Sequence, residues 1–224
     1  MNFIYLFITI FSLSIAQLSV DAQPPSIIET VNGNVPVFIT SDFNLDKILK
    51  QDNLDSKEGY PYKFGHSFNV DINFFDYAIV DTLSNGDKIF RFKIYSPDAY
   101  SINLIFDSFY LPKGTELFIY DNDYSNQIGA FTYINNKSYN RFSTSPISGD
   151  QIILEYFEPL AVSEPSQINI ESIIHGYQPT FSNNYRGYDD SQSCNNNVNC
   201  PEAQPWIDEK NSVVMTLTDG GTRL

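Results

Sequence analysis

Apolar and polar residues alternate along the middle of the chain, from about residue 68 to residue 178. The alternating runs are short, and turn signals separate them about every ten residues. Among these signals, the Asn85–Gly86 pair favours a tight hairpin, because both residue types accept the backbone angles that such a turn requires. Evenly spaced short strands are typical of two packed antiparallel sheets. We therefore predict an all-β, antiparallel β-sandwich with a jelly-roll-like arrangement over residues 68–178.

A second hairpin is predicted from the stretch YSINLIFDSFYLPKGTELFIYDND. Residues 111–114, LPKG, supply the turn, and alternation on either side gives each strand one apolar face. The apolar residues of the two strands are Ile102, Leu104, Phe106, Leu117 and Ile119. The pattern predicts that these two strands pair directly with each other.

Residues 23–67 are more polar and are broken by proline and glycine, so we predict a lead-in to the sandwich. One short helix is expected in the stretch SDFNLDKILKQDNLDSK, with Ser41 or Asp42 as its N-cap. Leu45, Ile48 and Leu49 would then share one helical face.

The N-terminus carries an apolar run from Phe3 to Ile15, which is short for a membrane span. Small residues follow it, as signal peptidase requires, at SVDA-Q and at SIA-Q. We predict a signal peptide over residues 1–22 with cleavage after Ala22, and a secreted chain with no membrane attachment after cleavage. Cleavage after Ala16 and an uncleaved membrane anchor are the alternatives.

The chain of 224 residues has a formal net charge of −14, and 15% of its residues are aromatic. Abundant Tyr and Phe suit a globular all-β protein. The acidic balance argues against a nucleic-acid partner, because a phosphate backbone would be repelled.

Residues 179–193 have the polar, Asn- and Ser-rich composition of a linker. The stretch NSVVMTLTDGGTRL then predicts a strand, an Asp-Gly turn and the start of a second strand. A lone hairpin is marginally stable in water. It therefore either pairs with the sandwich or belongs to a larger domain.

The stretch SCNNNVNCPEAQPWIDEKNSVVMTLTDGGTRL resembles the start of the catalytic domain of secreted bacterial trypsin-like serine endopeptidases of the lysyl endopeptidase type. The residues that carry this resemblance are Ser193, Cys194, Cys200, Pro201, Glu202 and Trp206. Upstream, SPDAYSINLIFDSFYLPKGTELFIYDND, IGAFT, SGDQIILEYFEP and IIHGYQ resemble that family's β-sandwich pro-domain in order and spacing.

The resemblance implies that residues 68–178 are a pro-domain and that residues 194–224 are the truncated start of a double β-barrel. The sandwich would assist folding of the cognate protease catalytic domain or inhibit it before removal. By the same resemblance, Cys194 and Cys200 would each bond to a cysteine further along the catalytic domain. A local disulfide between the two cysteines is the alternative.

A processing site is predicted at Arg186–Gly187, because Arg186 is the basic residue between His175 and Lys210 in the linker region. A protease that prefers a basic residue before the cut would cleave there. The alternative is an ordinary exposed arginine.

A trypsin-like site needs Ser, His and Asp together, and in the family that the chain resembles these lie downstream of Leu224. His66 and His175 are interpreted as packing residues, so this chain is predicted to be inactive alone and to need no cofactor. The competing hypotheses are a free-standing secreted β-sandwich binding or adhesion module, and a protease inhibitor.

Asp121 and Asp123 alternate with other residues as at the start of a calcium loop. An EF-hand loop would require Gly and Glu where Asn126 and Thr132 stand. An Asx-type turn is therefore favoured, and no metal site is predicted.

Overall fold

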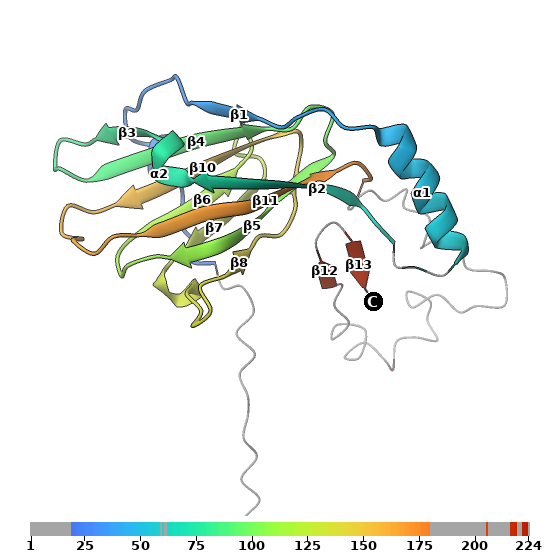
Figure 1. Ribbon diagram of the computed structural model, residues 1–224. Coiled ribbons are helices and arrows are strands. Elements are labelled where there is room, and N and C mark those ends of the chain that lie inside the picture. Colours follow the sequence, from blue (N-terminus) through green and yellow to red (C-terminus); the bar gives the residue numbers. More distant parts are fainter. Residues whose placement is uncertain are drawn as a thin grey trace, which may run out of the picture.

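The computed structural model describes residues 19–58, 60 and 62–179, and beyond them Pro205 and the backbone of residues 216–218 and 221–223. Two β-sheets lie face to face in this part of the chain, and few residues are helical (Figure 1). The predicted all-β class is therefore confirmed.

The first sheet has six strands, in the order β1-β4-β10-β6-β7, with β3 also paired to β4. Neighbouring strands run antiparallel except β1 and β4, which are parallel. The strands are β1 (Val37–Ile39), β3 (Ile79–Thr82), β4 (Lys88–Tyr95), β6 (Glu116–Tyr120), β7 (Gln127–Phe131) and β10 (Gln151–Glu158).

The second sheet has five strands, in the order β2-β11-β5-β8, with β9 also paired to β5, and all its pairs are antiparallel. The strands are β2 (Gly65–Asn73), β5 (Ser101–Tyr110), β8 (Phe142–Ser143), β9 (Ile147–Ser148) and β11 (Gln167–Gly176). Two further strands, β12 (Thr216–Thr218) and β13 (Gly221–Arg223), pair as a separate antiparallel hairpin. The helices are η1 (Pro25–Ile27), α1 (Leu45–Lys57), α2 (Phe74–Tyr77) and η2 (Tyr133–Asn135).

The core lies between the inner faces of the two sheets. Both sheets contribute fully buried aliphatic and aromatic side chains, including Phe92, Leu104, Phe106, Leu117 and Leu154. The alternation of the sequence therefore identified which side chains face inward, because side chains of a strand point to opposite faces in turn.

The hairpin predicted at Asn85–Gly86 is confirmed, since β3 and β4 pair antiparallel on either side of it. Gly86 has a φ of +89°, which favours glycine, and its N–H donates to the Leu83 carbonyl at 2.9 Å.

The hairpin predicted across residues 111–114 is wrong. β5 belongs to the second sheet and β6 to the first, so the chain crosses between the sheets at this point. The Asn136 side chain fixes the crossing: its Oδ1 accepts from the Leu111 N–H at 2.9 Å and its Nδ2 donates to the Leu111 carbonyl at 2.8 Å. Leu111 itself is buried in the core between the sheets.

The segment before residue 68 contributes to the sheets. Its β1 strand extends the first sheet, and β2 begins at Gly65. Further upstream, Val20 and Ala130 exchange two backbone hydrogen bonds of 3.0 Å. β6 is buried on both faces, and Ala22 packs against the Phe118 cluster on its outer face.

The helix predicted in the lead-in is confirmed as α1. Its N-cap is Asn44, and not Ser41 or Asp42: the Asn44 side chain accepts from the Lys47 N–H at 2.9 Å. A cap accepts from an N–H that has no partner within the first helical turn, and Asn44 stands immediately before that turn.

Candidate functional site

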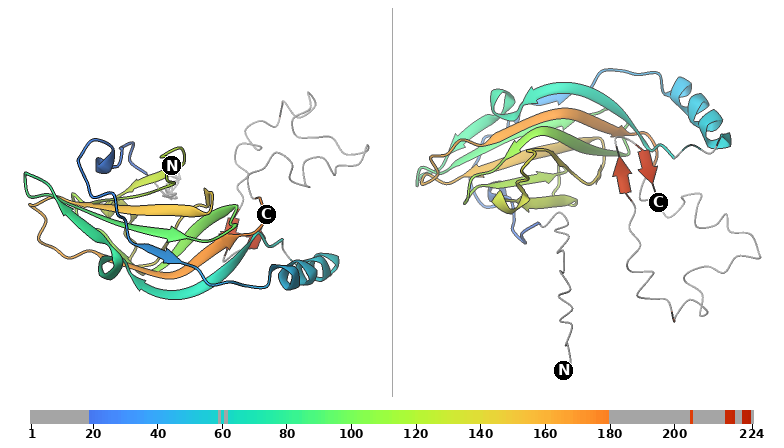
Figure 2. Two further views of the ribbon diagram at one scale, coloured as in Figure 1. Left: turned by 90° about the horizontal axis from the view of Figure 1, so that it is seen from above. Right: turned by 60° about the horizontal axis from the view of Figure 1, so that its bottom comes forward.

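The chain leaves the sandwich beside α1. β11 ends at Gly176, and the Tyr177 hydroxyl then donates to Asp52 Oδ2 of α1 at 2.7 Å. The Gln178 N–H donates to the Phe64 carbonyl at 3.1 Å. We call this end of the second sheet the exit end; Figures 1 and 2 show α1 projecting from it.

Two histidines face each other on neighbouring strands at the exit end. His66 of β2 lies opposite His175 of β11. The Phe43 ring stacks on His66, with ring centres 4.6 Å apart, and meets His175 edge-on at 4.9 Å. Because Phe43 directly precedes the N-cap of α1, this aromatic cluster fastens the start of the helix to the sheet.

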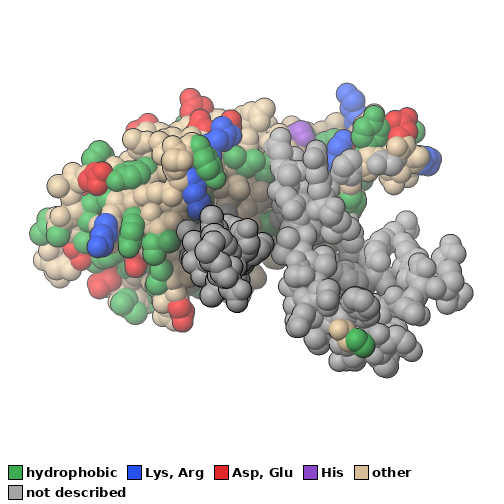
Figure 3. Space-filling view, turned by 90° about the horizontal axis from the view of Figure 1, so that it is seen from below, with side chains coloured by type: hydrophobic (Ala, Val, Ile, Leu, Met, Phe, Trp, Pro, Cys, Tyr) green, Lys and Arg blue, Asp and Glu red, His purple; other side chains and the backbone are tan. Residues whose placement is uncertain are grey.

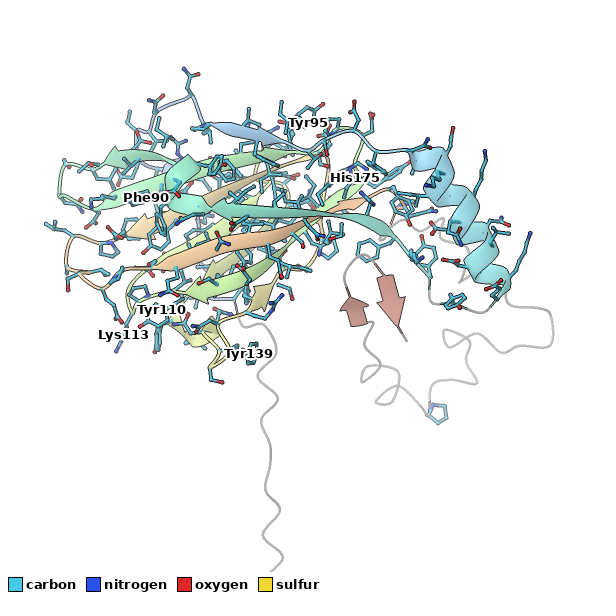
Figure 4. The ribbon with its side chains drawn as sticks, in the orientation of Figure 1. Phe90, Tyr95, Tyr110, Lys113, Tyr139 and His175 are labelled. Carbon is cyan, nitrogen blue, oxygen red and sulfur yellow. The ribbon has the colours of Figure 1, made fainter. Side chains whose placement is uncertain are left out.

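Hydrogen bonds add to this attachment of α1 to the sheet. We call the attachment, formed by Phe43, His66, His175, Ser96 and Thr40, the joint. His175 is only 3% exposed, and its Nδ1 lies 2.8 Å from Ser96 Oγ, which lies 2.9 Å from Thr40 Oγ1. Ser96 follows β4, and Thr40 precedes α1. The predicted packing role of His175, which is labelled in Figure 4, is thus confirmed, and its ring connects β11 to Ser96 and, through Ser96, to Thr40.

Both imidazoles are held toward the neutral form. Burial lowers the pKa of His66. Burial, and then the neighbouring His66, lower the pKa of His175, while Asp98 acts in the opposite direction. A proton on either ring would therefore be less favourable in the folded protein than in the unfolded chain.

The protein is expected to lose stability as the pH falls below about 6.5, the ordinary histidine pKa. Below that value the unfolded chain binds protons that the folded state, with its lowered pKa values, does not. Urea unfolding at several pH values between 5 and 7.5 measures this loss. His175→Gln, which keeps a polar group for Ser96, is expected to flatten the slope; an unchanged slope in this variant would show that the joint does not carry the effect.

The surface of α1 carries both apolar and charged side chains. Leu45 and Leu49 are each 38% exposed, and no residue of the helix is buried. Figure 3 shows apolar, basic and acidic side chains next to one another on this helix. The apolar face that the sequence predicted is thus not part of the core between the sheets.

Most predicted site residues lie outside the described part of the chain. This applies to Cys194, Cys200, Arg186 and Gly187. Their disulfide bonding and processing therefore stay predictions. Ala22 is described and half-buried, and its carbonyl accepts from Gln127 Nε2 at 3.0 Å.

The Asp121 loop forms the turn that the sequence favoured. Asp121 Oδ2 accepts from Ser125 Oγ at 2.7 Å and from the Asn126 N–H at 3.0 Å. Burial tends to raise the pKa of Asp121, but these donors together lower it. Asp123 is exposed, and over the described residues no group of three or more His, Cys, Asp or Glu side chains is placed to hold a metal ion.

A buried carboxylate, Glu155, was not predicted from the sequence. Glu155 of β10 is fully buried, and it accepts from the Tyr120 hydroxyl at 2.6 Å and from the Ser26 N–H at 2.9 Å. Burial and the neighbouring carboxylate raise the pKa of Tyr120. The network fastens the N-terminal segment to the outer face of the first sheet. No local pattern marks it, since Glu155 stands in a run of apolar residues.

The tyrosines of the sandwich are spread over the molecule. Tyr120 is buried, Tyr110 donates to Glu164 at 2.7 Å, and Tyr139 is exposed. Figure 4 shows Tyr95 at a distance from Tyr110 and Tyr139. These four tyrosines therefore do not form one exposed surface.

The fold and the joint define a class: a two-sheet β-protein in which the end of β11 is anchored to a projecting helix. We found no match for this chain among protein-family models, curated proteins or solved structures. Among the described residues, no helix is both long and apolar enough to cross a lipid bilayer.

Proposed function

We propose that this chain is the N-terminal pro-region of a secreted trypsin-like serine endopeptidase of the lysyl endopeptidase type. The proposal starts from the resemblance around Cys194 and Cys200, and the structural observation that supports it is the anchored exit of the chain, where Tyr177 bonds to Asp52 and Phe43 packs against two histidines. The chain that leads on to the linker therefore leaves the sandwich at a fixed point, next to a helix with exposed leucines.

The sandwich acts by binding in this proposal. It has a jelly-roll-like arrangement, and it assists folding of the catalytic domain or blocks its cleft until removal. Residues 194–224 form the first hairpin of the barrel; the antiparallel pairing of Thr216 with Arg223 supports this assignment. Cys194 and Cys200 bond to cysteines further along, and cleavage at Arg186–Gly187 releases the enzyme.

The proposal is tested by expressing the reading frame continued beyond Leu224, with and without residues 23–178. We expect serine endopeptidase activity only when those residues are present, or when the 224-residue chain is supplied as a separate molecule. Equal activity from both forms would contradict a pro-region role. A chain that ends at Leu224 and binds a glycan would instead fit a free-standing binding module.

A further inference from the structure

The outer face of the second sheet has an unusual composition at the exit end. Ile174 of β11 lies opposite Ser67 of β2 and Asn103 of β5. Their chain neighbours Ile173 and Leu104 point into the core. Since side chains alternate between faces, Ile174, Ser67 and Asn103 point outward.

Ile174 and Asn103 are buried on this outer face, as is Ser101 of β5, whereas Ser67 is half-buried. Ile174 is 0%, Ser101 2% and Asn103 7% exposed. Further along the same sheet, Asn69 and Asp107 are exposed. The covered area therefore lies toward the exit end, with Ser172, 5% exposed, at its margin.

Three polar atoms in this area are buried without a hydrogen-bond partner: Ser67 Oγ, Ser101 Oγ and Asn103 Oδ1. Burying a polar group is unfavourable unless it is bonded. All three can accept a hydrogen bond from a backbone N–H. A segment that lies across this face with free N–H groups would satisfy them.

Two glycines keep the area shallow. Gly65 and Gly176 pair with each other across β2 and β11. A Cβ at Gly176 would lie 2.3 Å from Ser101 Oγ, and one at Gly65 would lie 2.8 Å from Ile174 Cγ2. The result is a flat surface of small residues around one isoleucine, which we call the seat. Its residues are Gly65, Ser67, Ser101, Asn103, Ile174 and Gly176.

We propose that the seat holds the C-terminal segment of this chain, residues 212–223, which contains β12 and β13. The views in Figures 1 and 2 place β12 and β13 beside the exit end. The chain leaves the sandwich at the same end, and the residues between Pro179 and β12 are enough to return, at about 3.3 Å each. The stretch SVVMTL supplies apolar side chains that a two-stranded hairpin cannot bury alone.

The inference deepens the proposed function, because it makes the seat the surface through which the sandwich holds the first strands of the enzyme. Docking of the hairpin can nevertheless be measured in the 224-residue chain itself. If the hairpin docks in a chain that encodes no protease, the proposed function is contradicted, but docking of the hairpin in the seat is not. The two proposals can therefore be contradicted separately.

Hydrogen exchange of the amides of residues 212–223 tests the seat. We expect slow exchange in the intact chain, and exchange about tenfold faster or more in Asn103→Lys. Asn69→Lys is the matched control, with the same substitution on the exposed part of the same face, and is expected to leave the rate unchanged. Fast exchange in the unsubstituted chain would overturn the inference.

A second variant covers the case in which Asn103→Lys unfolds the sandwich. Leu217→Lys lies in the hairpin and leaves the sandwich sequence intact. Hydroxyl-radical footprinting is expected to show Ile174 protected in the unsubstituted chain and oxidised at least several-fold faster in Leu217→Lys. If Ile174 stays equally protected in this variant, the hairpin does not occupy the seat.

Discussion

Phe106→Ala is expected to lower the free energy of unfolding by about 3–5 kcal/mol, as measured by urea unfolding. Phe106 is fully buried, and its ring centre lies 5.6 Å from that of Phe109 and 6.1 Å from that of Phe142. Its removal takes apolar surface out of the core and leaves a cavity between the sheets. Since a natural domain is stable by about 5–15 kcal/mol, the loss would be a large share of the total.

Tyr139→Ala is the control for this prediction. Tyr139 is 66% exposed, so its truncation is expected to change stability by no more than about 0.5 kcal/mol. A loss below about 1 kcal/mol for Phe106→Ala, or an equal loss for both variants, would contradict the assignment of the core between the two sheets.

Glu155→Leu is expected to lower the free energy of unfolding by about 2–5 kcal/mol, because it removes the acceptor of the buried Tyr120 hydroxyl and of the half-buried Ser26 N–H. The N-terminal segment should also detach from the first sheet, which faster hydrogen exchange at Ser26 would report. Glu155→Gln, which keeps one acceptor oxygen and nearly the same shape, is expected to lose less. Unchanged exchange at Ser26 in Glu155→Leu would show that the carboxylate does not hold this segment.

The sequence predicts those features of the fold that depend only on neighbouring residues, namely strand alternation and tight turns. Alternation marked the inward residues of β5, and the Asn85–Gly86 pair marked the β3–β4 turn. Alternation does not tell which strand is the partner. The sequence therefore gave no sign that the chain crosses between sheets at Leu111, because that crossing depends on Asn136, far along the chain.

The candidate site was less accessible from the sequence. The joint requires His66 and His175 to stand in register on neighbouring strands, and Phe43 to reach both rings. Such register depends on the packing of the whole sheet, and no spacing in the sequence expresses it. The functional proposal came instead from the resemblance around Cys194 and Cys200, which lie outside the described residues.

We propose that the sandwich precedes and serves a protease domain. Sequencing the transcript past the Leu224 codon tests this most directly. We predict an open frame that supplies a histidine, an aspartate and a serine in trypsin-like settings, together with cysteines that can pair with Cys194 and Cys200. A stop codon directly after Leu224 in the native transcript would contradict the claim.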